Sequence, residues 1–201
     1  MVKVIKIYPT GFSCNSYLVT ANDRTAILID AGQPGVMEDV MDEGLKVTHV
    51  LLTHGHFDHV GGCLSVQHAG AQIGCHKLET DVITDYNLSE EFGTAFKMFK
   101  PNFTFEEGEM EIEGIRVKIL HTPGHTKGSV CFVIENNLFT GDTLFCGNIG
   151  RTDFATGDQA ALEKSIKRLY KLPGDYTVYA GHDRETTLEW ERKHNFYVRE
   201  D

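Results

Sequence analysis

The sequence predicts an α/β domain in which two sheets rich in antiparallel strands pack together and helices cover their outer faces. Short segments rich in β-branched and aromatic residues recur along the chain and end in turn residues, which is typical of strands. Helix-like segments are interleaved with them, and layers of the two kinds bury one another's apolar faces. With 201 residues, the chain is expected to form a single domain, residues 1–201, whose core needs no disulfides.

Ten short segments are predicted to be strands. The residues at 21–24, Ala-Asn-Asp-Arg, fit a hairpin turn between the second strand and the third. The predicted strands are Val2–Tyr8, Asn15–Val19, Thr25–Asp30, Val47–Thr53, Phe103–Phe105, Met110–Ile112, Arg116–Leu120, Val130–Ile134, Leu138–Thr140 and Thr177–Tyr179.

Helices are predicted where capping residues flank apolar positions at helical spacing. Pro34 marks the entry to one helix and Gly44 its end, and Asp158 is a good N-cap for another. The stretch 79–100 is mixed and is expected to be helical in part. The predicted helices are Val36–Glu43, His59–Ala69, a helix from Asp158 to Leu172, and Thr186–His194.

The charge and composition of the chain disfavour several classes of binding partner and cellular location. The formal net charge of −10 disfavours nucleic acid and anionic lipid surfaces, so we expect a small-molecule substrate. No apolar stretch approaches the roughly 18 residues that span a bilayer, and the first ten residues lack the features of a secretory signal, so a cytoplasmic location is expected. Five scattered cysteines without a CxxC pair argue against a disulfide framework or a thiolate zinc finger.

Three histidines and an aspartate fall within six residues, directly after a predicted apolar strand. His54 and His56 are two residues apart in an extended segment, so they point to the same side. The chain must then turn, so Asp58 and His59 approach from the start of a helix. One segment therefore supplies two ligands to each of two neighbouring metal sites. Imidazole nitrogen and carboxylate oxygen suit zinc, iron or manganese.

Three further candidate ligands share one local pattern. His125, Asp142 and His182 each lie just after a predicted strand, in a turn that contains glycine. Such strand ends converge at one edge of a sheet, and glycine lets the backbone turn sharply close to a metal. The pattern predicts that these three residues complete the site.

The motifs THGHFDHVGG, HTPGHTKGS, FTGDTLF and AGH resemble those of the metallo-β-lactamase superfamily, over nearly the whole chain. The resemblance implies an αβ/βα four-layer sandwich, with two mixed sheets face to face, helices on the outer faces, and metals in a cleft at one edge. It implies that Asp30 supports the ligand loop from behind. The implied ligands are His54, His56 and His125 for a first metal, Asp58, His59 and His182 for a second, and Asp142 as a bridge.

Within the superfamily, residues 146–154 (CGNIGRTDF) and 185–187 (ETT) resemble the glyoxalase II-like branch. This resemblance implies a dinuclear metal-dependent hydrolase that cleaves a thioester such as S-lactoylglutathione by attack of a hydroxide shared between the metals. Zinc is the favoured metal, with iron or manganese also suited, and Asp58 would orient the hydroxide as a catalytic residue. The basic helical extension that holds glutathione in longer members is absent, since only 19 residues follow His182.

Two alternatives remain open at this point. Persulfide dioxygenases share the fold and most of the motifs, but they use a single iron held by two histidines and a carboxylate. A non-catalytic metal-binding module is the other alternative, although such modules usually lose ligands and here all seven positions are filled. Metal content and turnover distinguish the three.

Other polar residues near the motifs are expected to have structural roles. Arg151 and Asp153 are expected to form a salt bridge within their loop or to order that loop. Lys127 is expected to be a solvated lysine. The remaining histidines, expected to be structural or exposed, are His49, His68, His76, His121 and His194.

Overall fold

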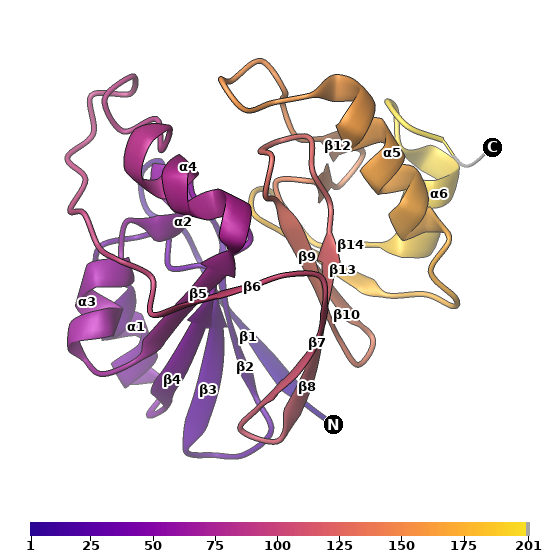
Figure 1. Ribbon diagram of the computed structural model, residues 1–201. Coiled ribbons are helices and arrows are strands. Elements are labelled where there is room, and N and C mark those ends of the chain that lie inside the picture. The colour runs from indigo at the N-terminus through magenta and orange to yellow at the C-terminus, as the bar shows by residue number, and fades with distance from the viewer. Residues whose placement is uncertain (200–201) are drawn as a thin grey trace.

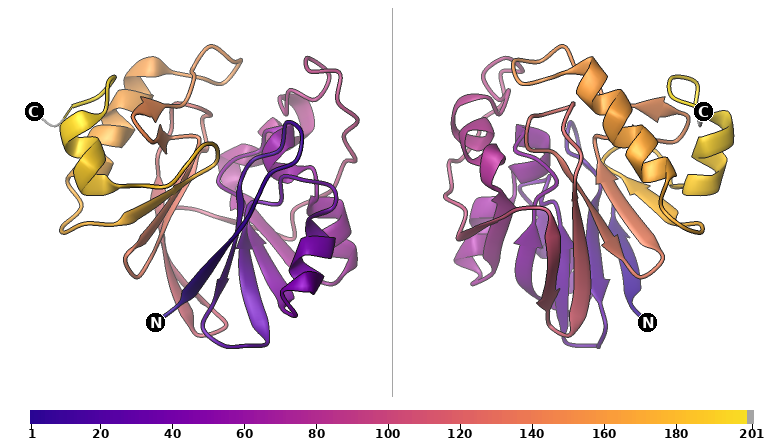
Figure 2. Two further views of the ribbon diagram at one scale, coloured as in Figure 1. Left: turned by 180° about the vertical axis from the view of Figure 1, so that it is seen from behind. Right: turned by 45° about the vertical axis from the view of Figure 1, so that its right-hand side comes forward.

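Two six-stranded sheets face each other in the computed structural model, which describes residues 1–199, and helices cover the outer side of each sheet (Figure 1). The views in Figure 2 show the helices of the two halves on opposite sides of the molecule. Three apolar clusters lie between the successive layers: helix on sheet, sheet on sheet, and sheet on helix. The predicted αβ/βα four-layer sandwich is therefore confirmed.

The first sheet is mixed and has the order β1-β2-β3-β4-β5-β6. Its first three strands are antiparallel neighbours, whereas β4, β5 and β6 each run parallel to the strand before them. Helices make the crossovers that parallel neighbours require. The elements of this half are β1 Lys3–Ile7, β2 Ser16–Thr20, β3 Thr25–Ile29, α1 Val36–Asp42, β4 Lys46–Leu51, α2 Phe57–Val60, α3 Cys63–His68, β5 Gln72–His76, the 3-10 turn η1 Lys77–Glu79, α4 Thr80–Asp85 and β6 Phe103–Phe105.

The second sheet is also mixed and has the order β14-β13-β10-β9-β8-β7. Only β10 and β13 are parallel, and the long helix α5 lies between them in the chain. A small two-stranded sheet, β11 with β12, follows β10. The elements of this half are β7 Gly108–Ile112, β8 Ile115–His121, β9 Val130–Ile134, β10 Asn137–Gly141, β11 Leu144–Phe145, β12 Asn148–Ile149, α5 Gln159–Tyr170, β13 Thr177–Ala180, β14 Thr186–Thr187 and α6 Leu188–His194.

Strand β3 shows how the layers follow from the sequence. Successive side chains of a strand point to opposite faces. Ala26 and Leu28 accordingly pack under the helices of the first half, while Ile27 and Ile29 pack against the second sheet. Both faces are buried, so the strand is apolar at every one of these positions instead of alternating.

All ten predicted strands overlap strands of the structure, but β5 was not predicted. Its sequence, Gln-Ile-Gly-Cys-His, carries a glycine in the middle, which weakens the strand pattern. The structure explains the glycine, because a Cβ added to Gly74 would lie 2.3 Å from the Phe103 ring on the neighbouring strand β6. The two-residue strands β11, β12 and β14 were also missed, since so few residues carry no periodicity.

The single helix predicted over His59–Ala69 is wrong. The structure has two short helices there, α2 and α3, separated at Gly61 and Gly62. A Cβ on Gly61 would lie 2.6 Å from the carbonyl oxygen of Gly32, and one on Gly62 would lie 2.4 Å from that of Gln33. The two glycines therefore let the helix pair pass against the loop after β3. In the stretch 79–100, only Glu79 and α4 are helical.

No helix among residues 1–199 has both the length and the apolar composition that crossing a membrane requires.

The crowding at Gly74 gives a stability prediction. Gly74→Ala should lower the free energy of unfolding by about 1–3 kcal/mol, because the new methyl group overpacks against Phe103. The loss should shrink when the same change is made in a Phe103→Leu background, where the ring is gone. Urea denaturation of the four proteins of this cycle tests it. An equal loss in both backgrounds would rule out the ring as the cause.

Candidate metal centre

All seven predicted ligands lie together at one end of the two sheets, although they come from distant parts of the chain. The first four follow β4: His54 and His56 lie in the segment that leads into α2, and Asp58 and His59 lie in α2 itself. His125 lies in the loop after β8, Asp142 directly follows β10, and His182 follows β13. Each ligand thus lies on a segment that directly follows a strand whose residues are fixed in the core.

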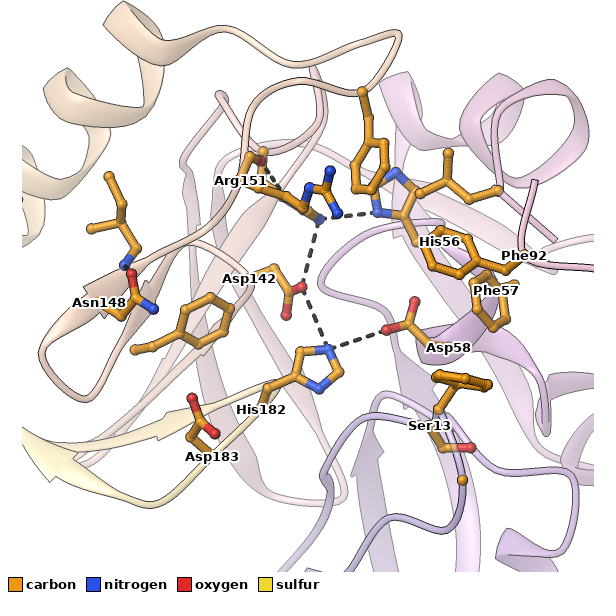
Figure 3. A pocket seen from close by; sticks show the side chains of 17 residues that line it. Ser13, His56, Phe57, Asp58, Phe92, Asp142, Asn148, Arg151, His182 and Asp183 are labelled. Atoms are coloured by element: carbon orange, nitrogen blue, oxygen red, sulfur yellow. Dashed lines mark hydrogen bonds and ion pairs between the residues drawn. The ribbon is translucent and has the colours of Figure 1, made fainter.

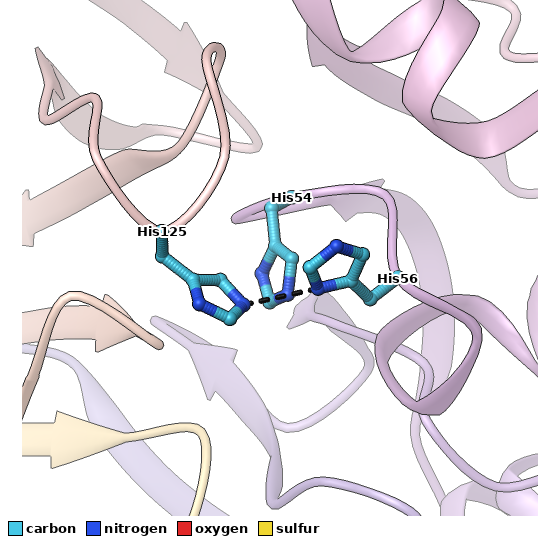
Figure 4. A group of neighbouring side chains, drawn as sticks. All are labelled: His54, His56 and His125. Carbon is cyan, nitrogen blue, oxygen red and sulfur yellow. Dashed lines mark hydrogen bonds between the residues drawn. The ribbon is translucent and has the colours of Figure 1, made fainter. Parts of the chain in front are cut away.

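Three histidines form one group of donors (Figure 4). Ring nitrogens of His54, His56 and His125 all lie within 4.8 Å of one another, and the three residues are buried. His56 Nδ1 and His125 Nε2 approach to 3.0 Å. His125 donates from Nδ1 to the carbonyl oxygen of Arg151 at 2.8 Å, so in the neutral ring Nε2 presents a lone pair to the group.

A second group of donors lies beside the first and is formed by Asp58, His59 and His182. His182 Nε2 lies 3.1 Å from Asp58 Oδ2 (Figure 3). Asp142 lies between the two groups. Its Oδ1 is 3.2 Å from His59 Nε2, and its Oδ2 is 3.6 Å from both His125 Nε2 and His182 Nε2. This is the position that a bridging ligand requires.

The donor set fits divalent cations. Within the described residues, three buried side-chain atoms make no well-directed hydrogen bond: His54 Nε2, His59 Nε2 and Asp142 Oδ1, of which the last two face each other at 3.2 Å. Buried polar atoms are almost always hydrogen-bonded, so three atoms without such a bond that converge on one place fit a cation held between them. A Cβ on Gly181 would lie 2.3 Å from Asp142 Oδ1 and 2.6 Å from His59 Cε1, so glycine is needed there for the donors to meet.

The histidines of the first group have lowered pKa values, which favours cation binding. Burial and the neighbouring imidazoles lower the pKa of His54 well below its usual value. Burial and the adjacent His125 lower the pKa of His56 to about 3, and burial lowers the pKa of His125 as well. All three rings are therefore neutral at pH 7, which is the form that binds metal.

The second group differs because it contains carboxylates. Burial opposes the protonation of His59, but Cys14 and the carboxylates of Asp142, Asp30 and Asp58 outweigh burial and raise its pKa well above the usual value. The pKa of His182 is also raised against burial, chiefly by Asp142. Burial alone would raise the pKa of Asp58 and Asp142, yet the positive charge of His59 lowers both. Without metal, His59 and His182 therefore tend to be protonated, so that protons balance the carboxylates where a cation would bind.

Asp30 supports the ligand loop from behind, as the resemblance implied. It is buried and accepts hydrogen bonds from Thr53 N at 2.8 Å and Thr53 Oγ1 at 2.7 Å. His59 Nδ1 lies 2.8 Å from Asp30 Oδ2, the oxygen that also accepts from Thr53 Oγ1. This contact turns His59 Nε2 toward the site, and such partners fix the tautomer and direction of a ligating imidazole.

Two residues near the centre were not predicted. Glu79 is fully buried behind the ligand loops, in a stretch that carries no recognisable motif. Cys14 lies with Asp30 and His59 within 4.8 Å, but burial raises the pKa of its thiol to about 12. Cys14 is therefore a neutral thiol at pH 7, and the sequence offered no signal for its position.

The centre opens into a cleft of about 520 Å³ that residues of both halves line (Figure 3). One wall is aromatic, with 5.5 Å between the ring centroids of Phe57 and Phe92 and 6.5 Å between those of Phe92 and Phe154. Arg151 places its guanidinium 4.2 Å from the Phe154 ring centroid and pairs with Asp153 at 2.6–2.7 Å. The salt bridge expected in this loop is present, and it neutralises the arginine at the rim.

Comparison with known proteins agrees with this geometry. Residues 9–182 match the family described as the metallo-beta-lactamase superfamily. The chain belongs to this superfamily. Its fold and its groups of histidine and carboxylate donors are those expected of a metallo-hydrolase that binds divalent metal.

Individual members of the superfamily match over the full length. Hydroxyacylglutathione hydrolase GloC of Haemophilus influenzae is 37% identical over 207 residues, which cover 96% of this chain and 97% of GloC. The solved structure of TTHA1623 in a di-iron-bound form has a TM-score of 0.86 and 33% identity, covering 98% of this chain and all of that one. The BLEG-1 B3 metallo-beta-lactamase has a TM-score of 0.88 and 31% identity, with 98% and 99% coverage.

The opposite pKa shifts of the two groups give a prediction for the metal-free protein. A pKa lowered on folding keeps a ring neutral below pH 6.5, and a raised pKa keeps a ring protonated above it. At pH 6.5, His54, His56 and His125 should therefore be neutral while His59 is an imidazolium. Long-range ¹H–¹⁵N NMR spectra of the imidazoles measure these states. Protonated rings in the three-histidine group at this pH would contradict the electrostatic description.

Proposed function

We propose that the protein is a dinuclear metal-dependent hydrolase that cleaves a thioester such as S-lactoylglutathione. The observation that carries the proposal is the convergence of seven nitrogen and oxygen donors, in two adjacent groups, at the floor of a cleft. Three of these donor atoms are buried without a well-directed hydrogen bond among the described residues. The polar floor of the cleft consists of candidate metal ligands. This fits a hydrolase in which a metal-activated water, and not a protein side chain, is the nucleophile.

The donors form two sets, one for each cation. His54, His56 and His125 would hold one cation, and Asp58, His59 and His182 the other, with Asp142 between them. A bound pair of divalent cations would supply Lewis acidity toward the carbonyl oxygen and a water activated at neutral pH.

Asp58 is the protein group best placed to orient the attacking water. Its pKa is lowered, so the carboxylate is ionised at pH 7 and accepts hydrogen bonds. It lines the cleft, with the side chain 17% exposed, and its Oδ2 lies 3.1 Å from His182 Nε2. An ionised carboxylate at the open side of the donor groups would hold one cation and would accept a hydrogen bond from the water.

The thioester specificity is supported by the relative GloC, whose name assigns it hydroxyacylglutathione hydrolysis. The carbon–sulfur bond of a thioester suits this site, because a thiolate leaves without help from a protein acid. The aromatic wall of Phe57, Phe92 and Phe154 gives the uncharged part of the substrate an apolar surface.

Zinc is the metal we propose, with iron or manganese as occupants of the same donors. The donors are imidazole and carboxylate groups, which suit all three metals. The relative TTHA1623 was solved with two irons, so the metal of this protein has to be measured in the purified protein.

Loss of a single donor should abolish most of the activity. His56→Ala and Asp142→Ala should each lower kcat/KM by at least about 100-fold to 1,000-fold, since each removes part of the electrostatic stabilisation of the reacting carbonyl. The matched control is His68→Ala, an exposed histidine at the end of α3, which should retain parental kinetics. Near-normal turnover in either ligand variant would refute the assignment.

A substrate screen with elemental analysis tests the proposed function itself. The purified protein should hydrolyse S-lactoylglutathione and simple thioesters faster than lactones or nitrocefin, and it should contain about two divalent metals per chain. Hydrolysis of nitrocefin alone would place it with the β-lactam-cleaving members. A single iron together with oxygen consumption on glutathione persulfide would identify a dioxygenase instead.

A further inference from the structure

Glu79 is a fully buried glutamate. It ends the 3-10 turn η1, directly after β5, and lies behind the candidate metal centre. Among the described residues, no lysine or arginine forms an ion pair with it, and it belongs to none of the groups of candidate ligands. An isolated buried charge is costly, so its position calls for other partners.

The partners of Glu79 are three hydrogen-bond donors from the two ligand loops. Its Oε2 accepts from the backbone N–H of Gly55 at 2.7 Å. Its Oε1 accepts from Thr126 Oγ1 at 2.7 Å and from the backbone N–H of Gly128 at 2.8 Å. Gly55 lies between His54 and His56, and Thr126 directly follows His125.

One carboxylate therefore joins the two segments that supply the three-histidine group. These segments follow strands of different sheets, β4 in the first and β8 in the second. One backbone bond, from Val130 N at the start of β9 to Thr53 O at 2.9 Å, also links these regions. Glu79 fixes the two loops at positions adjacent to the ligands themselves.

The glycines of both motifs are required for this contact. A Cβ on Gly128 would lie 2.6 Å from Glu79 Oε1, and a Cβ on Gly55 would lie 3.2 Å from Glu79 Oε2 and 2.8 Å from Ile83 Cγ1. The backbone can approach the carboxylate this closely only without side chains. Gly128 is therefore required by its contact with Glu79, and Gly55 by its contacts with both Ile83 and Glu79.

We propose that Glu79 is a positioning residue that sets the spacing of His54 and His56 relative to His125, and thereby the affinity of the first metal site. The inference rests on the proposed metal centre. Burial raises the pKa of Glu79 to about 7 even though the three hydrogen bonds lower it. In the ionised form both of its oxygens only accept, whereas an amide in its place would turn an NH₂ group toward at least one of the three donors. Partners behind a metal ligand typically change metal affinity by about 10-fold to 100-fold when they are lost.

Glu191 offers a matched control within the same chain. It is also a fully buried glutamate, and it also accepts from several donors: Gly147 N, Thr186 Oγ1 and Asn195 Nδ2. None of these donors belongs to or adjoins a candidate ligand. Glu79→Gln and Glu191→Gln therefore make the same chemical change, and only the first makes it beside the metal centre.

The experiment measures cobalt binding by absorbance, in competition with a chelator, in a His182→Ala background that lacks one donor of the second group. Glu79→Gln should weaken cobalt binding by about 10-fold to 100-fold and alter the cobalt d–d bands. Glu191→Gln should leave both unchanged. Thermal unfolding of the metal-free proteins should show similar losses for the two variants. Thr126→Val, which removes one donor only, should weaken binding in the same direction by less, and it replaces Glu79→Gln if that variant does not fold.

The outcomes separate this inference from the proposed function. Parental cobalt affinity in Glu79→Gln, or equal weakening in Glu79→Gln and Glu191→Gln, would overturn the positioning role and leave the metal centre intact. Failure of the parent to bind cobalt would overturn both. Absence of thioester hydrolysis has no bearing on the inference, because substrate is not used.

Discussion

The structure depends on a set of buried nitrogen and oxygen donors that face one another across a small space. Imidazoles with lowered pKa values lie against carboxylates, and some donor atoms make no well-directed hydrogen bond among the described residues. Such an arrangement is unfavourable by itself, because buried polar atoms without partners cost free energy. A pair of divalent cations would satisfy all of them together. We therefore regard the fold as a frame that keeps these donors at a separation they would not adopt alone.

The ligands keep their positions because each lies on a segment that directly follows a core strand. The strands β4, β8, β10 and β13 are anchored on both faces by the apolar clusters, so the loops at their ends have fixed starting points. Additional contacts then fix the loops themselves: Asp30 holds His59 from behind, the Arg151 carbonyl holds His125, and Glu79 ties the two histidine loops together. Support of this kind is what a metal site needs in order to keep its ligand geometry.

Much of this arrangement could be predicted from the sequence, and the failures have physical causes. His54, Asp142 and the other candidate ligands were predicted because chemistry-bearing residues stood beside glycines after apolar strands. Strand β5 was missed because Gly74, which makes room for Phe103, interrupts its pattern. The break between α2 and α3 at Gly61 was missed because its cause is a contact with Gly32, in the loop after β3, which is distant in the sequence. Glu79 had no motif, since its partners lie 24 to 49 residues away.

The central claim is that the two donor groups hold one cation each. Anomalous X-ray diffraction from metal-loaded crystals tests it most directly, because it places each metal independently of the protein coordinates. We expect two adjacent peaks, one among His54, His56 and His125 and one among Asp58, His59 and His182, with density for Asp142 between them. A single peak elsewhere, or a peak at the Cys14 thiol, would contradict it.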